Sequence, residues 1–155
     1  AAMKKLFALL LALLMMILPA MAEQQKLTPA DAGLTAAGYV YIATSNRSGW
    51  YPLPEEGADP YEVTIQQNDA DGNVCENVVC ITPEGAYMLR SNCDNQDCID
   101  QGIVTLANKD TRILSNWIVC LPHQVVIKLC TAQEVLDIML ASITSSAAAS
   151  DNTAE

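Results

Sequence analysis

Six cysteines and a single histidine are the residues of this chain whose types can do chemistry. Cys93 and Cys98 are separated by four residues in the segment SNCDNQDCIDQG, and two residues separate Cys120 from His123. Two cysteines followed by a Cys-x2-His pair form a ligand set that zinc accepts in tetrahedral geometry. The same cysteines can instead form structural disulfides or run thiol–disulfide exchange. The spacing by itself leaves all three chemistries open.

The N-terminal residues decide which of these chemistries is favoured. Two lysines precede an apolar run that ends at Leu18, and the small-residue stretch Ala20–Ala22 follows it. This pattern is typical of a secretory signal peptide, which we expect at residues 1–22. An uncleaved membrane tether is the alternative, although the apolar run is shorter than the roughly 20 residues of a comfortable span. We therefore expect a secreted or extracytoplasmic protein with no stable membrane span after signal removal.

Outside the cytosol thiols persist as disulfides, and six cysteines are compatible with three bridges. The Asn- and Asp-rich segment between Cys93 and Cys98 can fold back on itself, so these two cysteines are the first candidate pair. Cys120 and Cys130 flank a predicted turn and form a second candidate pair. Cys120 can instead face the loop that contains the first pair, and this alternative stays open.

Cys75 and Cys80 lie in one predicted strand, where their Cα atoms would be about 16 Å apart. A disulfide needs Cα atoms within about 7 Å, so we do not expect these two to pair with each other. Export favours oxidised thiols over metal-bound thiolates, so we expect no cofactor, with zinc as the alternative. His123 is then a solvated turn residue. Exchange-active dithiols usually have two residues between their cysteines, which disfavours a catalytic thiol here.

The charge of the chain excludes one class of partner. The formal net charge is −10, and removal of the two signal lysines leaves six basic against 18 acidic residues, a charge of −12. Phosphate backbones and anionic lipid surfaces repel so acidic a chain, so we expect no nucleic-acid partner. The sequence contains no G-x-S-x-G, P-loop or H-E-x-x-H motif, so no enzymatic activity is expected.

Short runs of alternating apolar residues follow one another in the middle of the chain. GYVYIAT, YEVTIQQ and QVVIKLC are examples, rich in β-branched and aromatic residues and separated by turn residues. They predict an all-β fold, a small barrel or sandwich of short strands, over residues 36–130. The segment TAQEVLDIMLASI has a helical period and begins with a capping box formed by Thr131 and Glu134. We expect an amphipathic helix at residues 131–144, docked on the sheet.

The two ends of the mature chain show no apolar period. Residues 23–35 are polar and are predicted to be a flexible leader, and residues 145–155 are predicted to be a disordered tail. The mature chain is therefore expected to contain a single domain.

Three segments carry a resemblance to a known bacterial family. NVVCITPEGAYMLR, CDNQDCIDQG and IVCLPHQVVIKL occur in the order and with the spacing of the NusG domain II family, which the chain resembles over roughly residues 37–130. The chain is similar to the stand-alone exported members. The resemblance implies a compact β domain and three family cysteines, Cys93, Cys98 and Cys120. It departs from the family at His123, where asparagine is usual.

Together these observations predict an exported, non-enzymatic β domain that serves as a binding or accessory module of the cell envelope. Its expected partner is an envelope protein or a small ligand. The alternative is a redox- or metal-dependent accessory protein that uses Cys93, Cys98, Cys120 and His123.

Overall fold

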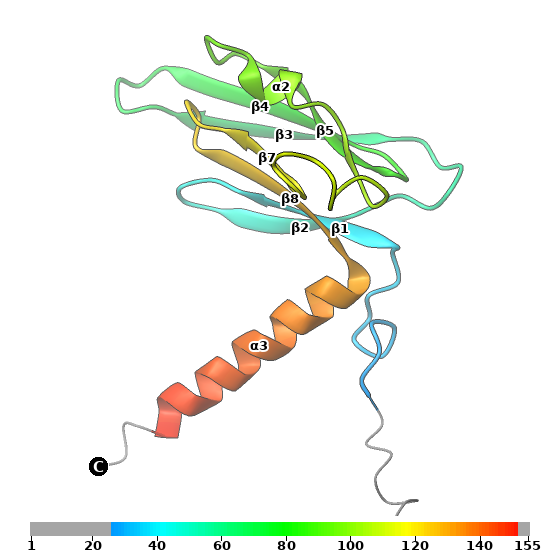
Figure 1. Cartoon of the computed structure of the whole chain (residues 1–155). Coiled ribbons are helices and arrows are strands. Elements are labelled where there is room, and N and C mark those ends of the chain that lie inside the picture. The colour runs from blue at the N-terminus through cyan, green and yellow to red at the C-terminus, as the bar shows by residue number, and fades with distance from the viewer. Residues whose placement is uncertain (1–25, 152–155) are drawn as a thin grey trace, which may run out of the picture.

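The computed structural model describes residues 26–151, and the side chains of residues 26–145. The predicted signal peptide and the start of the predicted leader lie outside the described residues. In the described part, eight strands form two antiparallel sheets of four strands each, and a long helix follows them (Figure 1). The prediction of an all-β fold with a C-terminal helix is confirmed, and of the two predicted architectures these strands form the sandwich.

The strand orders are β2-β1-β8-β7 in the first sheet and β3-β4-β5-β6 in the second. The first sheet contains β1 (Gly38–Ala43), β2 (Ser48–Pro52), β7 (Trp117–Cys120) and β8 (Val125–Thr131). The second contains β3 (Tyr61–Asn68), β4 (Val74–Ile81), β5 (Gly85–Ser91) and β6 (Val104–Thr105). Pairing of β1 with β8 joins the first and last strands, so the domain closes just before the helix begins.

The hydrophobic core lies between the two sheets because alternate residues of each strand face inward. Val40 of β1 and Ile127 of β8 enter it from the first sheet, and Val79, Ile81 and Met88 enter it from the second, each at most 1% exposed. The fully buried members of this core are aliphatic or sulfur-containing, and tyrosines pack only at its edge. A core without large aromatic rings depends on close packing of many small contacts.

A register shift between β4 and β5 determines what lies at one end of this core. The pairing shifts by one residue after Val78, so that Leu89 has no partner and forms a β-bulge. One extra residue inverts the alternation of inward and outward side chains. Beyond the bulge Ser91 therefore lies opposite Asn77 on the inner face, and Cys93 takes the next inward position.

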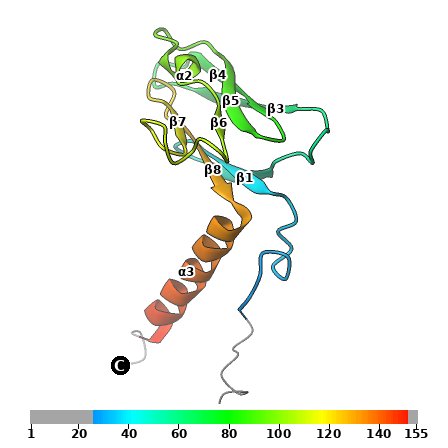
Figure 2. The same ribbon diagram turned by 45° about the vertical axis from the view of Figure 1, so that its right-hand side comes forward.

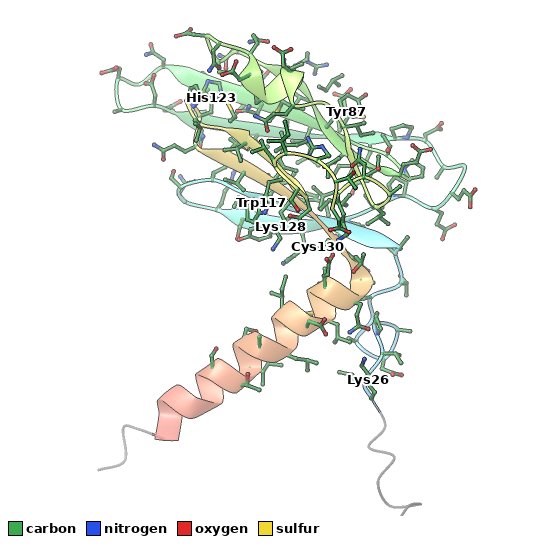
Figure 3. All side chains as sticks on the ribbon, viewed as in Figure 1. Lys26, Tyr87, Trp117, His123, Lys128 and Cys130 are labelled. Atoms are coloured by element: carbon green, nitrogen blue, oxygen red, sulfur yellow. The ribbon has the colours of Figure 1, made fainter. Side chains whose placement is uncertain are left out.

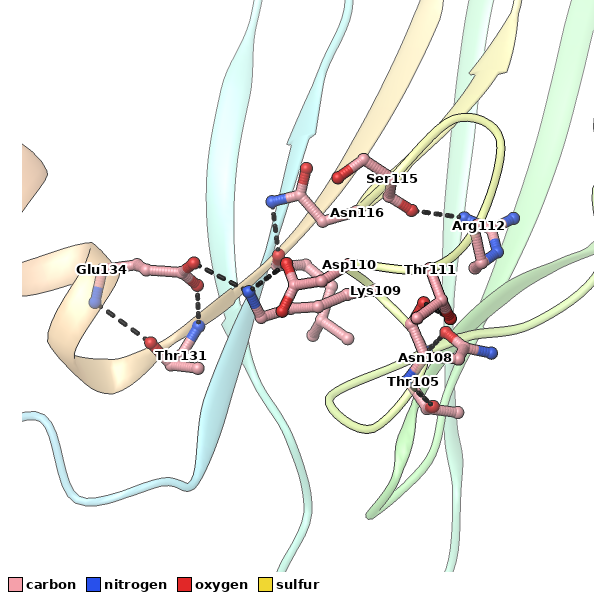
Figure 4. Close-up of polar contacts among 11 residues, drawn as sticks. Thr105, Asn108, Lys109, Asp110, Thr111, Arg112, Ser115, Asn116, Thr131 and Glu134 are labelled. Atoms are coloured by element: carbon pink, nitrogen blue, oxygen red, sulfur yellow. Dashed lines mark hydrogen bonds and ion pairs between the residues drawn. The ribbon is translucent and has the colours of Figure 1, made fainter.

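The helix α3 (Ala132–Asp151) begins at the predicted capping box. The Thr131 backbone N–H donates to Glu134 Oε2 at 2.7 Å, and the Glu134 N–H donates to Thr131 Oγ1 at 3.1 Å. Glu134 Oε1 also accepts a hydrogen bond from the buried Lys109 at 2.8 Å (Figure 4). The helix runs past the predicted end of 131–144, so the predicted tail starts as helix.

The prediction that this helix docks on a sheet is wrong. α3 points away from the sandwich in both views (Figures 1 and 2). Among its described side chains only Val135 and Leu136 are buried, while Ile138 and Ile143 are 42% and 63% exposed. The first turn alone therefore fixes the helix to the β domain. Within residues 26–151, no helix combines the length and apolar character that crossing a membrane requires.

The Lys109–Glu134 ion pair predicts a pH-dependent contribution to stability. Burial raises the pKa of Glu134, but hydrogen bonds from Lys109 and Thr131 outweigh it and hold the pKa below its usual value. A carboxyl group with a depressed pKa stabilises the fold above its unfolded pKa and loses that effect as the pH falls. We expect Glu134→Gln to lower the free energy of unfolding by about 1–2 kcal/mol at neutral pH, measured by urea denaturation.

The pH series supplies the control for this prediction. The difference between wild type and Glu134→Gln should shrink as the pH falls below 4.5, the ordinary pKa of the group. Asp137→Asn, which changes an exposed acid of the same helix bonded to Gln133, should have a much smaller effect at every pH. Equal losses in the two variants, or a difference that does not shrink as the pH is lowered below 4.5, would contradict the assignment.

Candidate functional site: a buried thiol cluster

The sulfur atoms of Cys93, Cys98 and Cys120 lie within 4.8 Å of one another at one end of the sandwich. Cys93 follows β5, Cys98 lies in the short helix α2 (Asp97–Asp100), and Cys120 is the last residue of β7. Each is at most 3% exposed. Cys120 thus faces the Cys93–Cys98 loop, as one of the two alternatives from the sequence predicted. These three residues are called the thiol cluster below.

All six cysteines lie in the described residues, and all six are free thiols. Cys93 Sγ and Cys98 Sγ are 3.6 Å apart, farther than the roughly 2.05 Å of an S–S bond. The disulfide between these two cysteines therefore stays a prediction. The predicted pairing of Cys120 with Cys130 is wrong for this fold. Cys120 lies opposite Val125, and Cys130 is five residues further along β8, about 17 Å away in an extended strand.

The other three cysteines lie outside the thiol cluster. Cys75 and Cys80 both belong to β4, as predicted, and their odd separation places them on opposite faces of the sheet. Cys80 lies opposite Tyr87 of β5 on the outer face. Cys130 lies at the opposite end of β8 from His123 (Figure 3). The three clustered cysteines are those that the family resemblance singled out.

Gln96 folds the loop that returns Cys98 to Cys93. Its backbone has a left-handed conformation with φ of 57°, which costs a residue with a Cβ about 1 kcal/mol or more. Its side-chain Nε2 donates to the carbonyl oxygens of Ser91 and Cys93, both at 2.7 Å. These two hydrogen bonds offset the backbone cost and close the loop across the cluster.

Gln101 joins the segment after α2 to the edge of β7. Its Nε2 donates to the Val119 carbonyl oxygen, and its Oε1 accepts from the Val119 N–H, both at 2.8 Å. The side-chain amide thus pairs with the edge strand as a backbone amide would. Arg112 in turn donates to the Gln101 carbonyl oxygen at 2.7 Å. This connection places Cys98 beside Cys120, and no spacing in the sequence marked either glutamine as important.

His123 is placed differently from both sequence predictions. It is 7% exposed, so it is not a solvated turn residue, although it does lie in the turn between β7 and β8. It does not belong to the group of three sulfurs, so it does not complete the predicted Cys3His ligand set. Burial lowers the pKa of His123, with Asp94 and Asp69 acting in the opposite direction. The imidazole is therefore neutral at neutral pH.

A chain of hydrogen bonds connects His123 with the thiol cluster. Asn77 Nδ2 donates to Ser91 Oγ at 3.0 Å, which leaves Asn77 Oδ1 to accept from His123 Nδ1 at 2.7 Å. The Cys93 N–H donates to the same Ser91 Oγ at 3.2 Å. Both acceptor sites of this hydroxyl are then used, so its proton remains to be donated. Cys120 Sγ lies 4.0 Å away, and Ser91 therefore directs a donor at the sulfur atoms.

The thiols of the cluster differ in acidity. Burial raises the pKa of Cys93, but hydrogen bonds from Ser91, Cys98, Cys120 and the Gln96 backbone outweigh the burial and bring it below its usual value. Burial, helped by the neighbouring sulfur atoms of Cys93 and Cys120 and opposed by a hydrogen bond from Ser91, raises the pKa of Cys98 to about 12. Because the two pKa shifts have opposite signs, Cys93 loses its proton before Cys98 does as the pH rises.

A cavity of about 290 Å³ adjoins the thiol cluster. Cys98 and Cys120 form part of its wall, Asp97 and Gln101 contribute polar groups, and Leu121 lies at its rim, 80% exposed. A larger hollow of about 520 Å³ near Pro52 and Pro54 has no cysteine in its wall. The smaller cavity is therefore the one that places a bound molecule next to the sulfur atoms.

The sequence model of the NusG domain II family matches residues 6–133. The chain belongs to the NusG domain II family. The resemblance inferred from the three cysteine-containing segments is thus confirmed. No curated protein sequence matches the chain.

Three solved structures from bacteria are among those to which part of this chain is similar. A DUF1312 family protein from Enterococcus faecalis is 18% identical, with a TM-score of 0.45 over 61% of this chain and 97% of its own. The Lin0431 protein from Listeria innocua, solved by NMR, is 20% identical, with a TM-score of 0.48 over 63% of this chain and 75% of its own. A DUF1312 family protein from Ruminococcus gnavus is 22% identical, with a TM-score of 0.38 over 59% and 96%.

Loss of the Gln101 side chain should open the thiol cluster. Gln101→Ala removes both hydrogen bonds to Val119, and we expect it to lower the free energy of unfolding by about 1–3 kcal/mol. Local opening should also raise the rate at which Cys98 and Cys120 are alkylated in the reduced native protein. Mass spectrometry of protein labelled for increasing times measures this rate at each cysteine.

The labelling experiment contains its own reference. Cys130 is equally buried but lies at the other end of the sandwich, so its rate should stay unchanged. Gln133→Ala, which removes a half-buried helix glutamine bonded to Asp137, should alter neither rate. Equal acceleration at all three cysteines would indicate global unfolding and contradict the proposed role of Gln101.

Proposed function

We propose that this chain is an exported, non-enzymatic β domain that acts as a binding or accessory module of the bacterial cell envelope. The observation that carries the proposal is the cavity beside the thiol cluster. Its wall combines apolar side chains with a few polar groups, including those of Asp97 and Gln101. Binding sites for small ligands have this composition and comparable dimensions. A small ligand, or a side chain of an envelope protein, fits such a site.

The placement of the single histidine supports binding rather than catalysis. His123 donates through Nδ1 to Asn77, and its ring is buried against the sandwich. A general base must lie within hydrogen-bonding reach of the proton that it removes. The Nδ1–H of His123 is used in the hydrogen-bond chain that positions Ser91, and His123 is not among the residues that line the cavity, so a molecule bound there lies outside the wall that this ring could reach.

Export is supported by the N-terminal sequence, and it predicts a defined mature N-terminus. Protein recovered from outside the cytoplasm should begin at Glu23, as measured by intact mass and N-terminal sequencing. Ala22→Asp removes the small residue before the cleavage point, so the precursor should accumulate. Gln25→Asp, just beyond that point, should be processed normally. Full-length protein in the membrane fraction would favour the tether, and full-length protein in the cytosol would contradict export.

Ligand binding at the cavity predicts contacts at its rim. A photoactivatable side chain at Leu121 should form a discrete adduct in intact cells that export the protein, because this residue borders the cavity. The matched control is Ile113, which is fully exposed and does not line the cavity. Mass spectrometry identifies the adduct. Identical products at both positions, or none at Leu121, would refute the cavity as the binding site.

A second candidate function is that of a redox- or metal-dependent accessory protein. One specific observation favours it, namely three thiols within 4.8 Å of one another, drawn from separate elements. The Ser91 hydroxyl, directed at these sulfurs, adds a donor that stabilises a thiolate. In this second candidate function the residues that bind the metal or exchange electrons are Cys93, Cys98 and Cys120, and His123 is not one of them.

A further inference from the structure

We propose that Cys93, Cys98 and Cys120 form a three-thiolate site for a zinc ion whose fourth coordination position opens into the adjoining cavity. The inference deepens the second candidate function and rests on it. It differs from the ligand set that the sequence predicted, because the fourth position belongs to a bound molecule rather than to His123.

The spacing of the sulfur atoms suits the ion. Zinc–thiolate bonds are about 2.3 Å long, and tetrahedral geometry then places the sulfur atoms about 3.8 Å apart. Cys93 Sγ and Cys98 Sγ are 3.6 Å apart, and all three sulfur atoms lie within 4.8 Å of one another. Side-chain shifts of less than about 1 Å therefore bring all three to bonding distance.

The donor set and its charge favour zinc over other ions. Thiolates are soft ligands that select zinc or monovalent copper over magnesium or calcium. Three thiolates with a divalent zinc ion leave one net negative charge, whereas monovalent copper leaves two. The site is buried, so the smaller residual charge costs less desolvation. The Ser91 hydroxyl is positioned to offset the remaining negative charge.

The residues around the cluster resemble the supporting shell of a metal site. Metal ligands are usually held by hydrogen bonds from outer residues, which fix their orientation and tune their basicity. Here His123 donates to Asn77, Asn77 donates to Ser91, and the Ser91 proton is free to reach the sulfur atoms. Asn77 is 1% exposed, so a buried polar chain ends at the thiols rather than in solvent.

The cavity determines what the fourth ligand is. Cys98 and Cys120 contribute to its wall, so an ion bound to both has one side directed at the cavity. Structural zinc sites have four protein ligands, whereas three protein ligands leave one position for water or a bound molecule. Asp97 and Gln101 line the same cavity and can contact that molecule.

Oxidation is the competing fate of the cluster. Cys93 and Cys98 can form a disulfide by releasing two protons and two electrons to a thiol oxidant of the exporting compartment. Bound zinc uses the same sulfur lone pairs, so the metal site and the disulfide exclude each other. The two states are separated by trapping free thiols with an alkylating agent at the moment of cell lysis, then measuring mass with and without reduction.

The test uses the full mature chain isolated from cells grown with zinc, without chelators or reductants. Wild type should contain one zinc per chain by elemental analysis. Cys130→Ser, which changes an equally buried cysteine far from the cluster, should retain the metal. Cys120→Ser should weaken zinc binding at least tenfold in competition with a chromophoric chelator, and Ser91→Ala should weaken it about tenfold.

Cobalt replacement tests the site in wild type, where folding of a variant is not in question. Thiolate-to-cobalt charge-transfer absorption is expected, and added imidazole should shift the visible bands because the fourth position is open. Zinc-free protein with a Cys93–Cys98 disulfide overturns the proposal, as does zinc binding that Cys120→Ser leaves unchanged or that Cys130→Ser equally abolishes. If added imidazole leaves the cobalt spectrum unchanged, the claim that the fourth coordination position is open is refuted. The crosslinking experiment at Leu121 tests the binding module, and its result does not depend on whether zinc is bound. The zinc site and the binding module can therefore be refuted independently of each other.

Discussion

The unpaired residue Leu89 in the β4–β5 pair is the feature on which the thiol end of the sandwich depends. Without the bulge, strict alternation from Met88 would turn Ser91 and Cys93 to the outer face. With it, Ser91 meets Asn77 inside, and Cys93 faces the end of the core. A single backbone irregularity thus sets the position of both a sulfur atom and the hydroxyl directed at the cluster. Bulges often re-aim side chains beside functional sites in this way.

Side-chain amides hold the rest of this end together. Gln96 closes the loop over Cys93, and Gln101 pairs with Val119 at the edge of β7. These few hydrogen bonds replace the continuous ladders that stabilise the middle of each sheet. An end held by few hydrogen bonds is expected to open at lower free energy than the core strands, and such opening would give the proposed ligand or ion access to the buried sulfur atoms.

Sequence patterns predicted much of the fold and only part of the site. The period of two located the main strands, and the capping box of Thr131 and Glu134 located the start of α3. The same helical pattern wrongly predicted docking, because an apolar face does not show what covers it. The position of His123 in a Pro-containing turn predicted solvation, yet its ring is buried against Asn77. Local composition does not show which side chains of a distant strand pack against a residue, as Asn77 of β4 does against His123.

By itself the sequence determined the fold class, the family and its three family cysteines, Cys93, Cys98 and Cys120, because each depends on local period or on spacing along the chain. Only the tertiary structure decided that Cys120 joins the other two, that His123 does not, and that a cavity adjoins them. The reason is geometric. These features depend on strand register, and a shift of one residue, as at Leu89, reverses which side chains meet while leaving the composition unchanged.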